Sequence, residues 1–266
     1  MSSNTNPGLI QYQILKRFDS IRHFTTTRLG GVSVGNYSSF NLGLFTGDLA
    51  ENISQNFDLL CSMTGIERNA IHLPFQTHSN RIFRIGENFL GQHAETKKSL
   101  LHGIDALITD IPGQCIGVST ADCVPILLYD PVNKAIGAIH AGWRGTHSQI
   151  VSKTITEMKS AFQTDPANLI AVLGPSISPD AYEVGAPLMD EFREAGFETK
   201  EIFSEKKGRI FLDLWKANKL LLTHVGVKEE NIEISGICTY GQHENFFSAR
   251  RLGISSGRMI SGIMLI

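Results

Sequence analysis

The residues best suited to chemistry lie at two points where a β-type run ends. Cys123 closes the segment Thr120-Ala121-Asp122-Cys123, and His140 opens the segment His140-Ala141-Gly142-Trp143-Arg144-Gly145. A thiolate and an imidazole are ligands for a borderline metal such as zinc, and they can also act as a nucleophile and its base. The sequence therefore predicts a chemical site that uses Cys123 and His140.

The elements on either side of these residues explain how they would meet. One β-type run extends over 115–129 with a break in its middle, a second covers 135–139, and Asp130-Pro131-Val132-Asn133-Lys134 forms the turn between them. Two such runs joined by a short turn are expected to pair as antiparallel neighbours. That pairing is predicted to set Cys123 opposite His140.

His78, which follows Gln76-Thr77, is a candidate third member of the site. One thiolate and two neutral imidazoles make three protein ligands, the number in a catalytic zinc site that keeps its fourth position for water or substrate. Three alternatives stay open at this point. Cys123 could instead be a small buried apolar residue, and the histidines could be turn residues. In the third alternative Cys123 and His140 form a metal-free nucleophile and base, with Asp122 or another acceptor orienting the imidazole.

Several polar residues are candidates for substrate contact. Arg28 follows a Thr-rich turn, Arg250 follows a Phe-Phe-Ser segment, and Arg144 lies close to His140. A guanidinium group suits bidentate recognition of phosphate or carboxylate, although each arginine has the alternative of a surface position or of packing over an aromatic ring. Asn41 and Gln76 are weighed in the same way, as substrate contacts or as side chains that cap their own turns.

The hydrophobic pattern predicts an α+β fold with one domain over residues 1–266. Helices are expected over 51–63, 150–162, 187–195 and 213–225, and strands over 11–24, 81–85, 105–109, 115–129, 135–139, 169–173, 232–237 and 259–266. Strands are the more numerous and several are consecutive, which indicates a layered sandwich of mixed, largely antiparallel sheet with helices packed outside. No linker of biased composition divides the chain.

Composition excludes several classes of protein. The net charge of −2, with scattered Lys and Arg, gives no electrostatic footprint for nucleic acid or an anionic membrane. Segment 1–7 lacks the basic and apolar regions of a secretory leader, and no stretch is apolar enough to span a bilayer. The four cysteines form no C-x-x-C pair, so free thiols are expected. A cytoplasmic monomer or small homo-oligomer is predicted.

Several motifs, in order and over nearly the whole chain, resemble the YfiH-like family, also called the laccase-domain or polyphenol oxidase family. They are Thr26-Thr27-Arg28, Asn41-Leu42-Gly43, Gln76-Thr77-His78, Thr120-Ala121-Asp122-Cys123-Val124-Pro125, His140-Ala141-Gly142-Trp143-Arg144-Gly145, Tyr182-Glu183-Val184-Gly185, Phe246-Phe247-Ser248-Ala249-Arg250-Arg251 and Gly257-Arg258-Met259. The chain departs from the family pattern at Phe45-Thr46, at Asp180-Ala181, and at Asn245 with Ala249. None of these departures is a proposed ligand, and they bear on the wall of the pocket and on substrate preference.

The resemblance implies an α/β/β/α layered fold, a zinc site of His78, Cys123 and His140, and a purine nucleoside and phosphate as the substrates. It implies phosphorolysis of adenosine, inosine and methylthioadenosine to the free base and a ribose 1-phosphate, with adenosine deamination as a side activity. Asp122 is then a catalytic residue, with Glu183 and Asp105 as further candidates for proton donor. Arg28, Asn41, Gln76 and Arg250 are then substrate contacts, and Arg144 supports the turn after His140.

Two other enzymes remain as alternatives. The first is a hydrolase that uses Cys123 and His140 without metal. The second is a copper-dependent polyphenol oxidase, with Cu²⁺ in place of Zn²⁺. The copper oxidase is chemically the weaker of the two, because several coppers need many histidine ligands and the nine histidines here form no His-x-His pair.

Overall fold

The computed structural model describes residues 8–266, and Met1–Pro7, on which the leader prediction depends, lie outside the described residues. Its helices are α1 Ala50–Thr64, α2 Glu87–Leu90, α3 Ala94–Leu100, α4 Trp143–His147, α5 Ile150–Phe162, α6 Ala186–Glu194, α7 Thr199–Ile202, α8 Leu214–His224 and α9 Ala249–Leu252. Its strands are β1 Leu9–Ile10, β2 Ile21–Thr26, β3 Ile71–His72, β4 Ile82–Arg84, β5 Ala106–Thr109, β6 Cys115–Thr120, β7 Val124–Asp130, β8 Ala135–Ala141, β9 Ile170–Leu173, β10 Glu183–Val184, β11 Phe203–Lys206, β12 Arg209–Leu212, β13 Ile232–Ile234 and β14 Met259–Leu265.

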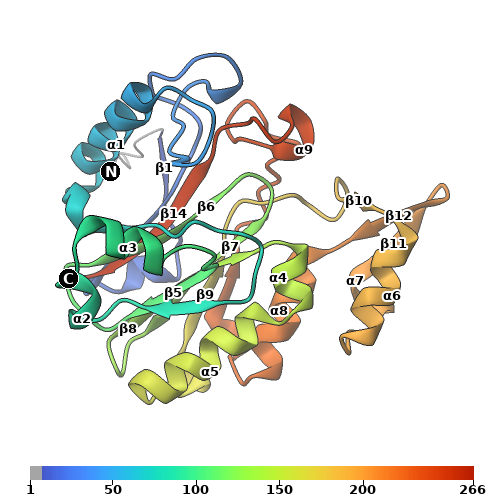
Figure 1. Ribbon diagram of the computed structural model, residues 1–266. Coiled ribbons are helices and arrows are strands. Elements are labelled where there is room, and N and C mark those ends of the chain that lie inside the picture. The colour runs from blue at the N-terminus through green and yellow to red at the C-terminus, as the bar shows by residue number, and fades with distance from the viewer. Residues whose placement is uncertain (1–7) are drawn as a thin grey trace, which may run out of the picture.

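Two large sheets form the centre of the molecule (Figure 1). One has the strand order β1-β2-β14-β6-β3 and the other the order β13-β9-β7-β8-β5-β4. Most pairings in them are antiparallel, and the pairs β3 with β6, β4 with β5 and β9 with β13 are parallel. The predicted α+β class with mixed, largely antiparallel sheet is confirmed. The prediction of a single domain over 1–266 stays a prediction.

The central strands are buried on both faces, because one face of each large sheet packs against the other sheet and alternate side chains of a strand point to opposite faces. In β7, Leu127 and Tyr129 pack between the two sheets, together with Ile116 of β6 and Ile263 of β14. The alternate residues of β7 face the opposite way and pack with α5 and α8, as Ile126 and Leu128 do. A strand that is buried on both faces has a nearly continuous apolar sequence, as residues 124–129 of β7 do.

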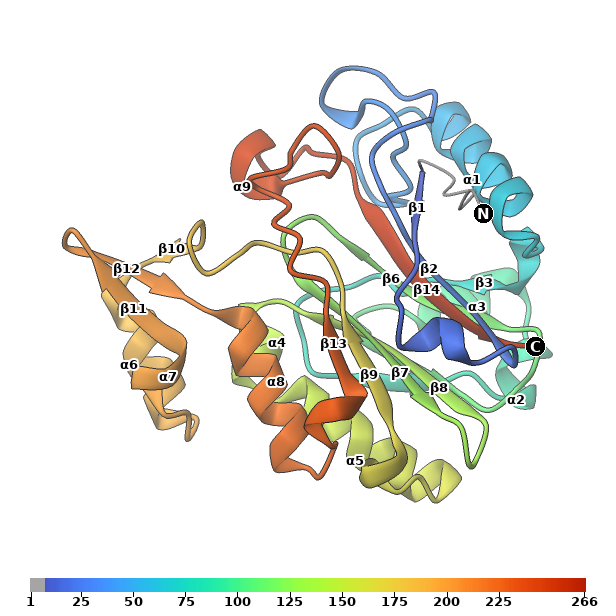
Figure 2. The same ribbon diagram turned by 180° about the vertical axis from the view of Figure 1, so that it is seen from behind.

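Helices cover the outer face of each large sheet (Figure 2). Helix α1 places Ile53, Phe57 and Leu60 on the outer side of the five-stranded sheet. It ends at Gly65, whose φ of 66° is the left-handed conformation that a helix C-cap favours. Helices α5 and α8 cover the six-stranded sheet. The order helix, sheet, sheet, helix is the α/β/β/α arrangement that the family resemblance implied.

A third, three-stranded sheet with the order β10-β12-β11 stands to one side of the two large sheets, next to α6 and α7 (Figures 1 and 2). Phe192 of α6 and Phe203 of β11 join this unit to the core that includes α8. Tyr182 directly precedes β10, so the chain enters this unit from the side on which the cavity described below lies.

Two sequence predictions need correction. The expected strand over 11–24 is instead a turn of 3₁₀ helix at Leu15–Arg17 followed by β2, because the chain folds back where Lys16 N donates to Tyr12 O. The hairpin of β7 and β8 is present, but His140 pairs with Pro125 and not with Cys123. The prediction was two residues out of register because the turn closes with Asp130 opposite Ala135, and that register sets Val124 opposite Ala141 and leaves Cys123 before the first pair.

Buried His23 of β2 gives a prediction for acid stability. Burial lowers the pKa of His23 from 6.5 to about 4, and its Nε2 accepts a hydrogen bond from Tyr12 N at 2.9 Å. Between these two pH values the unfolded chain binds the proton and the folded chain does not, so stability falls as the pH drops below 6.5. We expect His23→Gln to remove up to about 3 kcal/mol of this dependence. Urea unfolding of both proteins between pH 7 and pH 4.5 tests it, and parallel pH profiles would contradict it.

Candidate metal centre

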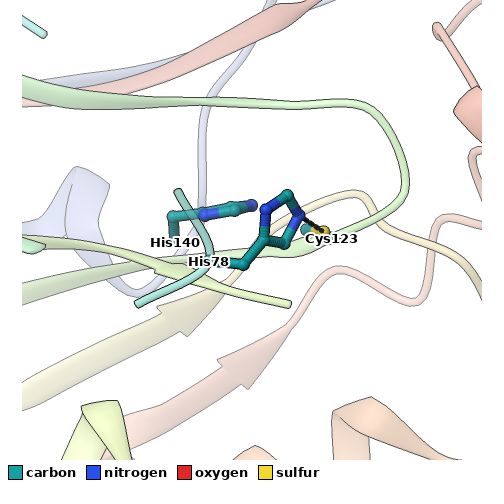
Figure 3. A group of neighbouring side chains, drawn as sticks. All are labelled: His78, Cys123 and His140. Atoms are coloured by element: carbon teal, nitrogen blue, oxygen red, sulfur yellow. Dashed lines mark hydrogen bonds between the residues drawn. The ribbon is translucent and has the colours of Figure 1, made fainter. Parts of the chain in front are cut away.

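Three side chains from separate segments converge at one end of the hairpin (Figure 3). The ligand atoms of His78, Cys123 and His140 all lie within 4.8 Å of one another. Cys123 Sγ is 3.7 Å from His78 Nε2, and the two imidazole rings are 4.8 Å apart, centroid to centroid, at 70°. His140 is buried at the end of β8, whereas His78 is exposed and Cys123 half-buried on the loops. A thiolate and two imidazoles at this spacing form a donor set that zinc prefers.

The carboxylate of Asp105 holds both histidines in place. It is fully buried and accepts a hydrogen bond from His140 Nδ1 at 2.7 Å, which leaves Nε2 of that ring for a ligand. The same carboxylate accepts the backbone N–H groups of Thr77, His78 and Ser79, and so fixes the turn that carries His78. His78 has a φ of 60°, a left-handed conformation that costs a non-glycine residue about 1 kcal/mol or more. Asp105 therefore positions two of the three candidate ligands.

The electrostatics of the group favour a thiolate. Burial alone would raise the pKa of Cys123, but the adjacent imidazoles of His140 and His78 outweigh it and lower that pKa to about 6. Burial also opposes the charge on Asp105, yet its hydrogen bonds with His140 and Ser79 hold the pKa of that carboxyl at about 2. A thiol ionised near neutral pH serves a metal ligand and a nucleophile equally well.

A cavity of about 550 Å³ opens beside these three side chains, within the size range of sites for small molecules. All three members of the group line it, as do Asp122 and Trp143. The rest of its lining comes from Gly43, Leu44, Phe45, Thr46, Phe75, Gln76, Ser119, Thr120, Ala121, Ile177, Tyr182, Leu214, Ala249, Arg250, Ile254 and Arg258.

The four predicted substrate contacts divide into two pairs. Gln76 and Arg250 line the cavity, and Gln76 also exchanges hydrogen bonds with the backbone of Ser119. Arg28 is not among the lining residues: its guanidinium donates to Ser38 O and His243 O and lies over the ring of Phe247.

Asn41 also lies outside the lining. Its side chain is fully buried and hydrogen-bonds Thr46 Oγ1, Asp48 Oδ2, Gly43 N and Arg258 N. It therefore supports the loop beside the cavity, which is the turn-capping alternative that the sequence offered. The roles of all four residues in substrate binding stay predictions.

Asp122 joins two other loops of the chain to the loop that carries Cys123. Its carboxylate accepts hydrogen bonds from Thr239 Oγ1, Ser248 Oγ and Arg250 N at 2.6, 3.0 and 2.7 Å. It is 8% exposed and lies beside Cys123 in the chain. Its predicted catalytic role is untested, and these contacts show that it fixes the segment carrying Arg250.

Sequence reasoning missed other members of the cavity wall. Arg258 lies there, with its guanidinium donating to Ser256 O, Gly257 O and Ile254 O. Thr120 is 1% exposed, and within residues 8–266 its Oγ1 has no hydrogen-bond partner. Thr120 belongs to the motif Thr120-Ala121-Asp122-Cys123 and Arg258 to the motif Gly257-Arg258-Met259. Membership of these motifs is the sequence feature that could have indicated both residues.

Gly142 supplies the space that the group needs. A Cβ atom there would lie 2.9 Å from Cys123 Sγ and 3.0 Å from His78 Cδ2, although the backbone φ of −70° suits alanine. We expect Gly142→Ala to displace both side chains and weaken metal binding at least about 10-fold, as second-sphere changes do. Gly86→Ala is the matched control, since Gly86 also caps a helix and has open space around it. Equal metal affinity in the two variants, measured against a chelator, would contradict this.

The fold and the site together define an α/β/β/α protein with a His-Cys-His group in the wall of a cavity of about 550 Å³. The sequence model of the family described as multi-copper polyphenol oxidoreductase laccase matches residues 22–266, and the chain belongs to this family. The chain is 44% identical over 267 residues to a protein of Bacteroides thetaiotaomicron named purine nucleoside phosphorylase, covering 100% of this chain and 99% of that one. It is 38% identical to a protein named adenosine deaminase RL5 from an unknown prokaryotic organism, covering 93% and 95%.

Solved structures agree with this assignment. The crystal structure of the Bacillus licheniformis hypothetical protein YfiH superposes with a TM-score of 0.90 at 30% identity, covering 98% of each chain. That of YlmD from Geobacillus stearothermophilus has a TM-score of 0.89 at 29% identity, covering 97% of this chain and 96% of that one. The YfiH-like resemblance and the prediction that the chain is an enzyme are confirmed. Within residues 8–266, no helix is long and apolar enough to cross a bilayer.

Proposed function

We propose that this protein is a zinc-dependent purine nucleoside phosphorylase. It converts adenosine, inosine and methylthioadenosine, with phosphate, to the free base and a ribose 1-phosphate, and it deaminates adenosine as a side activity. The observation that carries the proposal is the group of His78, Cys123 and His140 in the wall of a 550 Å³ cavity. The full-length similarity to a protein named purine nucleoside phosphorylase supports it.

The donor set fits the metal. His78, Cys123 and His140 would hold the zinc, and the hydrogen bond from His140 Nδ1 to Asp105 is the outer contact that metal-ligating histidines commonly make. When bound, zinc supplies Lewis-acid stabilisation of charge on a substrate oxygen. Copper is the alternative metal, because cysteine and histidine are also copper ligands.

The cavity residues suit phosphorolysis. In this reaction a phosphate oxygen bonds to the ribosyl C1′ while the bond from C1′ to the base breaks, and the base leaves with the bonding electrons and takes up a proton. Within the described part of the chain, the Arg250 guanidinium has one acceptor, Glu183 O on its Nη1, which leaves Nε and Nη2 for a phosphate oxygen. Positioning and charge stabilisation then supply most of the rate.

Two carboxylates act through other groups. Asp122 accepts Arg250 N and so sets the position of the proposed phosphate contact. Asp105 orients His140 and the turn of His78, and its complete burial behind His140 makes it a positioning residue in this proposal. Glu183 is exposed and lies outside the cavity lining, with its side chain paired with Arg209.

The experiment is an assay of purified protein with adenosine, run with and without phosphate. We expect one zinc per chain, release of adenine and ribose 1-phosphate only when phosphate is present, and slower formation of inosine in both cases. Omission of phosphate separates phosphorolysis from hydrolysis of the same bond. Adenine release that does not depend on phosphate, or none at all, would contradict the proposal.

A second candidate is a metal-free hydrolase, favoured by one observation. Cys123, His140 and Asp105 form a chain of thiol, imidazole and carboxylate, and the pKa of the thiol is lowered to about 6. Iodoacetamide treatment of metal-depleted protein separates the candidates. A hydrolase without metal is active until Cys123 is alkylated, whereas the phosphorylase is inactive before alkylation and recovers when zinc is returned.

A further inference from the structure

The cavity has an apolar rim formed by Leu44, Phe45, Phe75 and Ile254. Three of these side chains are unusually exposed for apolar residues, with Leu44 at 42%, Phe45 at 51% and Ile254 at 88%. Exposed apolar residues that gather around a concave site mark a surface that a ligand or partner covers. These exposed side chains therefore favour a ligand with an apolar face.

Hydrogen bonds fix the backbone of two of the segments that form the rim. Leu44 and Phe45 lie at the tip of a turn that Thr46 N closes on Gly43 O at 3.2 Å. Buried Asn41 fixes this turn by donating to Thr46 Oγ1 and accepting from Gly43 N. The same Asn41 accepts from Arg258 N, and the Arg258 guanidinium donates to Ile254 O, so the turn of Leu44 and Phe45 and the segment of Ile254 share one anchor. The exposed side chains of Leu44, Phe45 and Ile254 therefore lie on backbone that is hydrogen-bonded to the rest of the fold.

Phe45 offers the available aromatic ring. It packs against Phe75 at 4.5 Å between ring centroids and 72° between planes, and Phe75 stacks on His102 at 4.6 Å and 6°. The other two large rings of the cavity have cationic neighbours. The Arg144 guanidinium lies 4.3 Å from the Trp143 ring, and that of Arg250 lies 5.1 Å from the Tyr182 ring.

The cavity lining also includes polar and charged groups. They are Asp122, Arg250 and the candidate metal ligands. A nucleoside offers both kinds of surface to such a lining, because it joins a flat aromatic base to a polar sugar. Base stacking on an aromatic side chain contributes about 1–3 kcal/mol and tolerates changes of substituent, since it depends on the π face.

We infer that Phe45, supported by Phe75, is the platform on which the purine base of the substrate stacks. This inference rests on the proposed function and adds the residue that binds the base. Because stacking uses the face of the ring, Phe45 contributes equally to adenosine and inosine, which differ at the ring edge. It contributes nothing to the binding of phosphate at the polar end.

The test compares steady-state constants of Phe45→Ala, Phe45→Leu and Phe45→Trp with those of the parent protein. Phe45→Ala is expected to raise KM for adenosine and inosine alike by about 5- to 100-fold, to weaken inhibition by adenine to a similar extent, and to leave kcat within about 3-fold. Phe45→Trp retains low KM values and Phe45→Leu lies between them. The KM for phosphate and the zinc content stay unchanged in all three.

Val34→Ala is the matched control, because Val34 is 68% exposed and does not line the cavity. Nucleoside KM values that do not change in Phe45→Ala would overturn the inference, and so would a change confined to the KM for phosphate. The parent protein is assayed first with adenosine and phosphate. If the parent releases no adenine, the proposed function fails and this inference fails with it. If the parent is active and Phe45→Ala leaves the nucleoside KM values unchanged, only the inference is refuted.

Discussion

Cys123→Ala is expected to lose its metal and more than about 100-fold of its phosphorolytic activity. The thiolate is the single anionic ligand of the group, and removing it leaves two imidazoles, His78 on a loop and His140 at the end of β8. Changes in second-sphere residues commonly cost 10- to 100-fold in metal affinity, so the loss of a ligand exceeds that range. Zinc content by elemental analysis and adenine release from adenosine and phosphate are the two measurements.

Cys61→Ala is the control for this variant. Cys61 is a free, half-buried thiol on α1, outside the cavity lining. We expect it to keep one zinc per chain and full activity, which separates the loss of a ligand from the loss of any thiol. Added zinc is not expected to restore Cys123→Ala, since the ligand itself is absent. One tightly bound zinc per chain and parental rates in Cys123→Ala would refute the proposed centre.

The sequence predicted the layers well because apolar periodicity reports burial directly. The helix over 150–162 and the strands over 115–129 and 135–139 appear as α5, β6, β7 and β8. The register of the hairpin was less accessible, since it depends on the residues that close the turn, Asp130 and Ala135, and hydrophobicity does not indicate them. Cys123 nonetheless meets His140, because both lie at the same end of the hairpin and their side chains span the offset.

The candidate ligands were easier to identify from sequence than the groups that hold them. Asp105 was considered as a proton donor, yet its position follows from the pairing of β5 with β8, which sets Ala106 opposite Ile139. Strand order of this kind cannot be read from local pattern. Arg28 illustrates the same limit: its acceptors, Ser38 O and His243 O, come from a nearby loop and from a segment more than 200 residues away.

The turn that carries Leu44 and Phe45 depends on such a distant contact as well. Asn41 joins the turn of Gly43 and Thr46 to Arg258 N across most of the chain. Its single buried side chain therefore sets the shape of the cavity without lining it. The local contact with Gly43 N is the turn cap that the sequence offered as an alternative. The contact with Arg258 N joins residues 217 positions apart, and no local pattern indicates it.

Asp105→Asn is expected to weaken zinc binding about 10- to 100-fold while all three ligands remain. The Oδ1 atom accepts from His140 Nδ1 and His78 N, and Oδ2 accepts from Thr77 N, Ser79 N and Ser79 Oγ. An amide turns one of these acceptors into a donor, so at least two N–H or O–H groups lose their partner in a buried place. We expect a loss of about 2–4 kcal/mol in the free energy of unfolding, measured in urea.

Asp110→Asn is the matched control, because Asp110 makes an exposed pair with Arg84 and its loss costs at most about 1 kcal/mol. Excess zinc distinguishes the positioning role of Asp105 from that of a ligand. Activity of Asp105→Asn should rise toward that of the parent protein as zinc is added, whereas Cys123→Ala stays inactive. If Asp105→Asn kept the parental zinc affinity and stability, the buried carboxylate would not be what holds His78 and His140 in place. Recovery of activity with added zinc identifies Asp105 as the residue that keeps the ligands at binding distance. The five hydrogen bonds that its carboxylate accepts offset the unfavourable burial of its charge.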